Sequence, residues 1–296
     1  RDDVESRGLG DVYKRQGKRI FLYFERTHWL SSVYVGKEEV SKIDYISIPH
    51  NHELTQWLHP GKKELITFCI DNRYQYDTHK WDHAHSEFTQ INWNGVLGEI
   101  KLVAVDPVYV DDMQVYPDIK NKSIKVKMTV RNCTEHTASG KISFHVTGKD
   151  YRLQKEVPVT VTDSITYIEE EMFLGKDIHL WNEFHPNLYT LDCKLTSSVE
   201  GQSYAHEKST TFGMREVEAG EDHIILNGEP IHLRGTVENA VFPKTGYAPV
   251  DDASWERVLR ILKEYGMNHM RFHSWCPPAA AFRMACLLYT SDAADE

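Results

Sequence analysis

Runs of β-branched and aromatic residues, separated by turn-forming residues, fill the N-terminal third of the chain. They lie at Phe21–Glu25, Ser32–Gly36, Leu65–Asn72 and Gly98–Val105. Such runs are typical of β-strands, and no helical period competes with them. The pattern predicts an all-β segment, part of a jelly-roll sandwich, over residues 17–105.

A second β-rich stretch follows the first. Apolar and polar residues alternate along residues 108–132, and again at Lys141–Val146 and Leu188–Ser198. Strands that recur every ~8–12 residues are characteristic of immunoglobulin-like sandwiches, and roughly 110 residues is a suitable length for one. We therefore predict an immunoglobulin-like β-sandwich over residues 106–215.

A helical period appears only near the C-terminal end of the chain. Apolar residues recur at helical spacing from Trp255 to Tyr265, which indicates an amphipathic helix. Asp251 or Asp252 can cap its first turn, and Gly266 suits the left-handed residue that ends such a helix.

Strands are predicted on both sides of this helix. They lie at Ile231–Leu233 and Asn268–Phe272, and two consecutive prolines favour another helix that begins at Ala279. Because strands that alternate with helices form parallel sheets, residues 216–285 are expected to be the first βαβ units of a (β/α)8 barrel. Active sites of such barrels lie at the C-terminal ends of their strands.

Composition removes several classes of function. A formal net charge of −10 argues against a nucleic-acid partner, and no apolar run approaches the ~20 residues of a membrane span. The cysteines lack the spacing of zinc sites, so we expect buried thiols at Cys69, Cys133, Cys193 and Cys276. No cofactor is predicted.

One pair of histidines allows a different interpretation. His83 and His85 could place two imidazoles on one side of a strand, next to Asp82 or Glu87. Imidazole and carboxylate groups are zinc ligands, so a metal site is conceivable. A polar loop at the edge of a substrate pocket is the alternative.

The two ends of the chain do not resemble natural protein. Residues 6–16 (SRGLGDVYKRQ) and 286–296 (CLLYTSDAADE) resemble translated sequencing adapters. We therefore expect residues 1–16 and 286–296 to be artefacts and to be excluded from fold reasoning. The natural segment would then run from about Gly17 to about Ala285, and both of its ends would be arbitrary cuts. A natural polar tail and a natural short helix are the alternatives.

Several motifs, in order, resemble those of glycoside hydrolase family 2. Phe88–Leu102 looks like the signature of that family's sugar-binding domain, and Leu180–Leu191 is similar to the segment that ends its immunoglobulin-like domain. Phe212–Gly235 looks like its entry into the barrel. The resemblance covers essentially all of residues 17–285. It implies an exo-acting, retaining hydrolase of terminal β-galactosides, or else of β-glucuronides or β-mannosides.

The resemblance also implies which catalytic residues are absent. A retaining mechanism requires two carboxyl groups about 5–5.5 Å apart, and in this family later barrel strands carry them. We therefore expect no catalytic residue in this chain and an inactive fragment of an active parent enzyme. Asn182-Glu183 looks like the family's acid/base dipeptide, but it lies between Trp181 and Pro186 in the sandwich. A surface glutamate is the better interpretation.

Four residues are the candidates for substrate binding. Arg271 lies at or just past the C-terminal end of the second barrel strand, His273 and Trp275 come within a few residues of it, and Glu238 follows the first strand. Arg271 could orient a carboxylate through paired hydrogen bonds or form a structural ion pair. Trp275 could stack on a sugar or pack. His273 follows the arginine by two residues, whereas the family's histidine follows by three, which puts its role in doubt. Glu238 could reach the same face or remain solvated.

Two other classes of protein remain open. A non-catalytic carbohydrate-binding module, or a structural or adhesive β-sandwich, would explain the strands and the aromatic residues. Neither explains the predicted βαβ segment. The expected partner of the hydrolase, and equally of the carbohydrate-binding module, is a carbohydrate. The resemblance suggests a periplasmic or secreted bacterial parent protein that could be a homo-oligomer.

Overall fold

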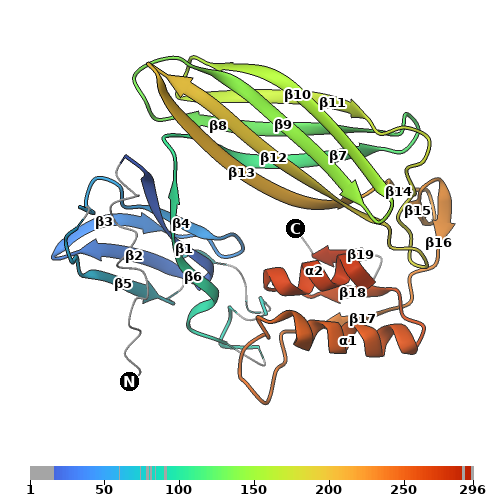
Figure 1. Cartoon of the computed structure of the whole chain (residues 1–296). Helices are drawn as coiled ribbons and strands as arrows, with labels where there is room; N and C mark the ends of the chain where they lie inside the picture. Colours follow the sequence, from blue (N-terminus) through green and yellow to red (C-terminus); the bar gives the residue numbers. More distant parts are fainter. Residues whose placement is uncertain are drawn as a thin grey trace. The chain divides into compact units, whose positions relative to one another are not determined.

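The structure of the chain is a computed structural model. It describes residues 17–59, 61–73, 75–77, 80, 82–83, 85–89, 92–288 and 291–294. The prediction of a mostly β protein is confirmed, because strands dominate the described residues and helices occur only near the C-terminal end (Figure 1). The chain forms two compact units. The first holds the described residues up to Asp106 together with 241–248, and the second holds residues 107–240 and the rest.

The first unit contains two three-stranded antiparallel sheets. One has the order β4-β1-β6 and the other β3-β2-β5. Their shared core includes Leu22, Phe24, Val33 and Leu54, all buried, so the sheets form two layers. The strands are β1 (Arg19–His28), β2 (Leu30–Val35), β3 (Glu38–Ile43), β4 (His50–Glu53), β5 (Ile66–Asp71) and β6 (Gly95–Val105).

The four strands predicted for this unit are confirmed as β1, β2, β5 and β6. β3 and β4 were not predicted, because both strands are short and rich in polar residues. Two of those polar residues, His50 and His52 of β4, are completely buried together with Ser31 of β2. A buried polar group is stable only when it is hydrogen-bonded, and the Ser31 hydroxyl bonds to both histidines.

The second unit begins with a sandwich of seven antiparallel strands. Three of them form a sheet of order β11-β8-β7 and four form a sheet of order β10-β9-β12-β13 (Figure 1). The strands are β7 (Val108–Asp118), β8 (Ser123–Asn132), β9 (Ala138–Gly148), β10 (Tyr151–Val161), β11 (Ile165–Phe173), β12 (Leu188–Val199) and β13 (Gln202–Gly213).

Alternation along these strands fills the space between the two sheets. In β8 every second residue from Ile124 to Val130 is buried, and the residues between them are charged or polar and more exposed. Ile142, Phe144 and Leu191 of the other sheet join the same core. The fourth strand, β10, pairs with β9, whereas in a constant-type immunoglobulin domain the fourth strand belongs to the opposite sheet.

A short antiparallel sheet follows the sandwich, and here one prediction is wrong. β14 (Val217–Ala219), β15 (Ile224–Leu226) and β16 (Glu229–Ile231) pair in that order. Residues 231–233 are therefore the end of a hairpin strand and the start of a loop, not the first parallel strand. Asn227 and Gly228, at φ 54° and 86°, form the two-residue hairpin turn that an Asn-Gly pair favours.

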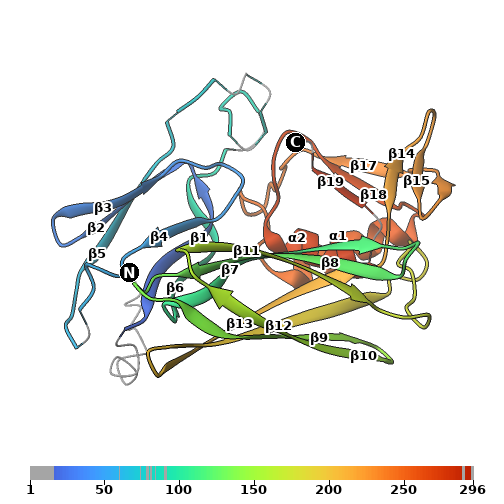
Figure 2. The same cartoon turned by 90° about the horizontal axis from the view of Figure 1, so that it is seen from above.

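The parallel strands and both helices come last. β17 (Gly235–Glu238), β18 (His269–Phe272) and β19 (Ser291–Ala294) form one parallel sheet. The helices α1 (Asp252–Glu264) and α2 (Ala279–Leu288) lie on one face of it (Figure 2). The predicted helix is confirmed, since Asp251 caps α1 by accepting a hydrogen bond from Ser254 N and Gly266 adopts φ 75°. The strand at 268–272 and the helix start at Ala279 are also confirmed.

The expected artefacts at the two ends stay predictions. Residues 1–16 lie outside the described residues. At the other end, α2 continues three residues past Ala285, and β19 pairs with β18 through backbone groups. Backbone pairing at an open strand edge is available to almost any sequence, so it carries no information about the origin of residues 286–296.

The cysteines differ in part from the prediction. All five are thiols, and Cys193 is buried as expected, whereas Cys69 and Cys133 are exposed on the surface. Burial raises the pKa of Cys193 to about 12, so this thiol stays protonated and unreactive at neutral pH. No described helix is both long enough and apolar enough to span a bilayer.

Candidate functional site

The parallel strands bring the predicted substrate-binding residues to one end of the sheet. In the register of β17 and β18, Val237 lies beside Arg271 and Glu238 lies beside Phe272. Arg271 is therefore the penultimate residue of its strand, as predicted. Because successive side chains point to opposite faces of a strand, Arg271 shares a face with Val237, and Glu238 shares the opposite face with Phe272.

The turn after β18 is fixed by one backbone carbonyl. The oxygen of Glu238 accepts hydrogen bonds from the backbone N–H of His273 at 3.0 Å and from Nε1 of Trp275 at 3.0 Å. Ser274, between them, has a φ of 58°, and its hydroxyl lies 2.9 Å from Nδ1 of His273. His273 is thus held at the C-terminal end of the strand pair, half-buried.

Trp275 is placed as a packing residue. Only 7% of it is exposed, and its ring meets that of Phe272 edge-on with the centroids 5.4 Å apart. Phe272 in turn contacts Trp255 of α1 at 5.8 Å. A platform for a sugar needs an open aromatic face, so this geometry supports packing between sheet and helix rather than stacking on a ligand.

Arg234 and Asn268, which precede β17 and β18 at the opposite end of the sheet, form a cluster with Glu183. The sequence analysis did not predict this cluster. Asn268 is buried, and its Nδ2 donates to Glu183 Oε2 at 2.7 Å and to the carbonyl of His232 at 3.1 Å. Its Oδ1 accepts the backbone N–H of Arg234 at 2.8 Å, and the Arg234 guanidinium lies 3.5 Å from Glu183. We call Glu183, Arg234 and Asn268 the Glu183 clamp.

The clamp corrects the interpretation of Glu183 as a plain surface residue. Its side chain is only 18% exposed. It joins the loop between β11 and β12 of the sandwich to the residues that precede the parallel strands β17 and β18. Asn182 turns the loop, since its Oδ1 accepts the backbone N–H groups of Phe184 and His185. The spacing in sequence between Glu183 and Asn268 gave no signal of this pairing.

Trp181 strengthens the same junction. It is 1% exposed, its Nε1 donates to the carbonyl of Cys286 in α2 at 3.2 Å, and the Arg215 guanidinium lies 4.5 Å above its ring. Its own carbonyl accepts from Nδ2 of Asn227 in the hairpin turn at 3.0 Å. The segment Trp181–Glu183 is therefore a structural anchor.

His83 and His85 do not lie on a strand, so the arrangement that the metal site required is not formed, and the interpretation as a polar loop fits the structure better. The described residues around them form turns, while Ala84 lies outside the described residues. His85 is buried beside Asp82, at 3.3 Å, and its ring meets that of His28 with centroids 5.2 Å apart. Burial, assisted by His85, lowers the pKa of His28 to about 4. Within the described part of the chain, no three His, Cys, Asp or Glu residues are arranged to hold a metal.

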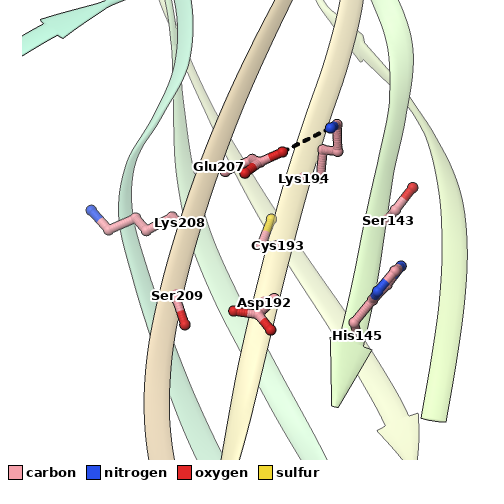
Figure 3. A pocket seen from close by; sticks show the side chains of 8 residues that line it. All are labelled: Ser143, His145, Asp192, Cys193, Lys194, Glu207, Lys208 and Ser209. Carbon is pink, nitrogen blue, oxygen red and sulfur yellow. Dashed lines mark hydrogen bonds and ion pairs between the residues drawn. The ribbon is translucent and has the colours of Figure 1, made fainter. Parts of the chain in front are cut away.

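A hollow of about 430 Å³ lies on the four-stranded sheet of the sandwich (Figure 3). Lys194 of β12 pairs with Glu207 of β13 at 2.7 Å, and His145 of β9 is the cross-strand neighbour of Asp192. The only thiol of this hollow belongs to the unreactive Cys193. Opposite charges facing each other across strands stabilise a sheet, and this arrangement needs no ligand to explain it.

Comparison with known proteins places the sandwich in a family. The model of the family described as "Glycosyl hydrolases family 2" matches residues 108–215, which are the seven strands β7–β13. Residues 108–215 are therefore similar to a domain of that family. The resemblance noted in the sequence is thereby confirmed for the region that the family model covers.

Relatives extend the likeness beyond the family 2 domain. A β-galactosidase of Thermoanaerobacter pseudethanolicus is 24% identical over 92% of this chain and 36% of its own length. A putative β-glucuronidase of Formosa agariphila is 26% identical over 88% of this chain and 24% of its own. The chain thus spans about a third or less of these two relatives.

A solved structure shares the fold over almost the whole chain. Bacteroides uniformis β-glucuronidase 2, covalently bound to cyclophellitol-6-carboxylate aziridine, superposes with a TM-score of 0.78 at 17% identity. The match covers 95% of this chain and 34% of that one. At this identity the likeness establishes the fold alone.

Proposed function

We propose that this chain is part of a retaining exo-β-glycosidase. Residues 17–105 would be part of its jelly-roll domain, residues 106–215 its immunoglobulin-like domain and residues 216–285 the first βαβ units of a (β/α)8 barrel. The observation that carries the proposal is the parallel βαβ unit, β17-α1-β18, which follows the region that matches the family 2 model and the short sheet β14-β15-β16. A binding module or an adhesin has no need of this unit.

The substrate we propose is a terminal β-galactoside, with β-glucuronides and β-mannosides as alternatives. Relatives named β-galactosidase and β-glucuronidase support this range. The acid/base and nucleophile carboxyl groups would lie on strands outside this chain, about 5–5.5 Å apart as retention requires. No cofactor would take part.

Two residues of this chain are proposed to serve that site. Arg271 lies at the C-terminal end of β18, where a guanidinium can hold a carboxylate through two parallel hydrogen bonds. His273 is fixed beside it by the Glu238 carbonyl and would bond a sugar hydroxyl. Glu238 is a weaker candidate, because its Cβ lies on the other face of the sheet.

The test is to express a longer reading frame that contains this chain and to assay it with p-nitrophenyl β-galactoside, β-glucuronide and β-mannoside. Turnover that releases the β-anomer first supports a retaining glycosidase, and Arg271→Lys should then lower kcat/KM at least about tenfold. Exposed Arg152→Lys is the matched control. Sugar binding without turnover would instead favour the non-catalytic carbohydrate-binding protein.

A further inference from the structure

A cavity of about 430 Å³ lies in the first unit, where the edge strands β3 and β4 approach each other. Its volume is within the range of small-molecule sites, ~300–1,000 Å³. The walls come from β1, β3, β4 and the turn that follows β4. Its lining residues are Arg19, Val40, Ser41, Asn51, Glu53, Thr55, Gln56 and Trp57.

The proton positions on one wall follow from a single carbonyl. Nε2 of His50 lies 2.8 Å from the carbonyl oxygen of Tyr45, which can only accept, so Nε2 carries the proton. Burial lowers the pKa of His50, so the ring is neutral and its Nδ1 is an acceptor. Ser31 must therefore donate its only hydroxyl proton to His50, at 2.6 Å.

The same reasoning continues to the cavity. Because the Ser31 proton is used, its oxygen accepts from Nε2 of His52 at 2.8 Å. Burial, then the neighbouring His50, lower the pKa of His52 to about 4, so its Nδ1 is an acceptor as well. Ser41 donates to that Nδ1 at 2.8 Å. Towards the cavity, Ser41 can therefore only accept a hydrogen bond.

Two further residues on the wall also present acceptors. Thr55 donates its hydroxyl proton to Glu53 Oε1 at 2.9 Å and accepts the backbone N–H of Ile20 at 3.0 Å. Glu53 has only acceptor oxygens and is ion-paired with Arg19. Arg19, the cation among the lining residues, is neutralised by this carboxylate, so an anion in the cavity would meet lone pairs and an ion pair without net charge, and its binding is disfavoured.

The remaining wall presents donors and an aromatic surface. Asn51 and Gln56 are exposed and Trp57 is half-buried. Within the described part of the chain, no hydrogen bond involves these three side chains. Two amides offer donors as well as acceptors, and an indole offers an apolar face with one N–H.

We propose that this cavity is a binding site for a neutral saccharide unit. A sugar ring carries hydroxyl protons for Ser41 and Glu53, oxygen atoms for the amides of Asn51 and Gln56, and C–H groups for Trp57. A phosphate lacks the protons, and an ammonium group lacks the acceptors. The inference goes beyond the proposed hydrolase function and does not rest on it, since a non-catalytic protein could carry the same site.

The test is saturation-transfer NMR on the full chain with three probes, the methyl β-glycosides of galactose, glucose and mannose. At least one neutral glycoside should receive saturation and shift the indole N–H signal of Trp57, which its absence in Trp57→Phe identifies. Gln56→Ala should weaken binding roughly threefold to tenfold, and the double variant Asn51→Ala/Gln56→Ala should abolish it. Both side chains are exposed, so the fold should persist, which circular dichroism checks.

Gln202→Ala, an exposed glutamine of the second unit, is the matched control and should bind like the wild type. The inference is overturned if none of the three glycosides binds or if binding survives in the double variant. It is also overturned if inorganic phosphate or methyl β-glucuronide displaces the neutral sugar. Failure of the longer protein to hydrolyse glycosides would overturn the proposed function and leave sugar binding at this cavity intact.

Discussion

At the scale of single residues, the carboxylate of Glu183 connects the loop between β11 and β12 to the buried Asn268 beside the parallel sheet. In sequence Glu183 looks like half of a catalytic dipeptide, or else a solvated carboxylate. In the structure it accepts a hydrogen bond from buried Asn268 and faces Arg234. A charged acceptor bound to a buried amide is among the stronger hydrogen-bonded groups, so this glutamate stabilises a junction.

We expect Glu183→Ala to lower the free energy of unfolding of the second unit by about 1–3 kcal/mol, because it leaves the buried amide of Asn268 with fewer acceptors. Glu183→Gln should cost less, since its carbonyl can still accept. Urea unfolding followed by fluorescence measures both changes. Glu207→Ala, which removes an exposed ion-paired glutamate, is the control and should unfold like the wild type. Equal loss in both alanine variants would contradict the clamp.

The buried histidines predict a pH dependence. The pKa of His52 is lowered from 6.5 to about 4 in the folded chain, so the unfolded chain binds more protons between these values. The contribution of neutral, buried His52 to the free energy of unfolding is fully present above pH 6.5 and is lost as the pH falls towards about 4. A difference of this size corresponds to about 3 kcal/mol.

Stability measured by urea unfolding between these two pH values checks this expectation. His52→Gln removes the titrating group and should flatten the slope, although its stability at neutral pH will be lower. His145→Gln, which replaces an exposed histidine of β9, should keep the slope of the wild type. An unchanged slope in His52→Gln would show that other groups cause the loss.

At the scale of secondary-structure elements, predictions succeeded where one face of the element is buried. The stripe of α1 buries Trp255 and Leu259, and the strands of the sandwich alternate between core and solvent. The first parallel strand failed because β17 has little apolar content, and Val237 is 51% exposed. Ile231, which suggested a parallel strand, is the last residue of the hairpin strand β16. The Asn227-Gly228 pair is typical of the turn of such a hairpin.

The candidate site was predictable to a similar extent. Parallel strands must bring their C-terminal ends together, so Arg271 and His273 could be placed near Glu238 from sequence order alone. The clamp could not, because pairing of Glu183 with Asn268 depends on how a sandwich loop meets a sheet. The burial of Trp275 could not either, since the packing partners of an aromatic ring are set by tertiary structure.

The start of α1 gives a prediction at this scale. Asp251 accepts hydrogen bonds from the backbone N–H and the hydroxyl of Ser254, and these bonds lower the pKa of its carboxyl group. Asp251→Ala should lower the melting temperature by roughly 2–4 °C. Asp251→Asn should keep most of the stability, because asparagine also caps helices. Calorimetry would contradict the cap if the two variants melted alike.

At the scale of the whole molecule, the buried imidazoles are unevenly distributed. His28, His50 and His52, whose pKa values are lowered by burial, belong to the first unit. The other buried histidines among the described residues, His83 and His85, belong to the same unit. The core cluster around Phe24 in the first unit is also smaller than the core cluster of the sandwich. The two units should therefore respond differently to acid.

We expect the first unit to open before the second as the pH falls from 6.5 to about 4. Amide hydrogen exchange read by mass spectrometry should show β1 and β4 losing protection while β8 and β12 keep theirs. Rates at each pH are first corrected for the intrinsic chemistry of exchange. Simultaneous loss in both units would mean that the acid response does not originate in these imidazoles.

The Glu183 clamp also has a consequence for the order in which the chain is made. Its two ends are separated by 85 positions in the sequence, and ribosomes add about 5–20 residues per second. Glu183 is therefore synthesised about 4–17 s before Asn268 exists. The last strand of the sandwich, β13, ends at Gly213, after Glu183 and well before Asn268. Once β13 has been made, the sandwich is complete in sequence, and the loop between β11 and β12 already carries Glu183. The sandwich can thus fold first and present a finished surface on which the parallel strands assemble as they emerge.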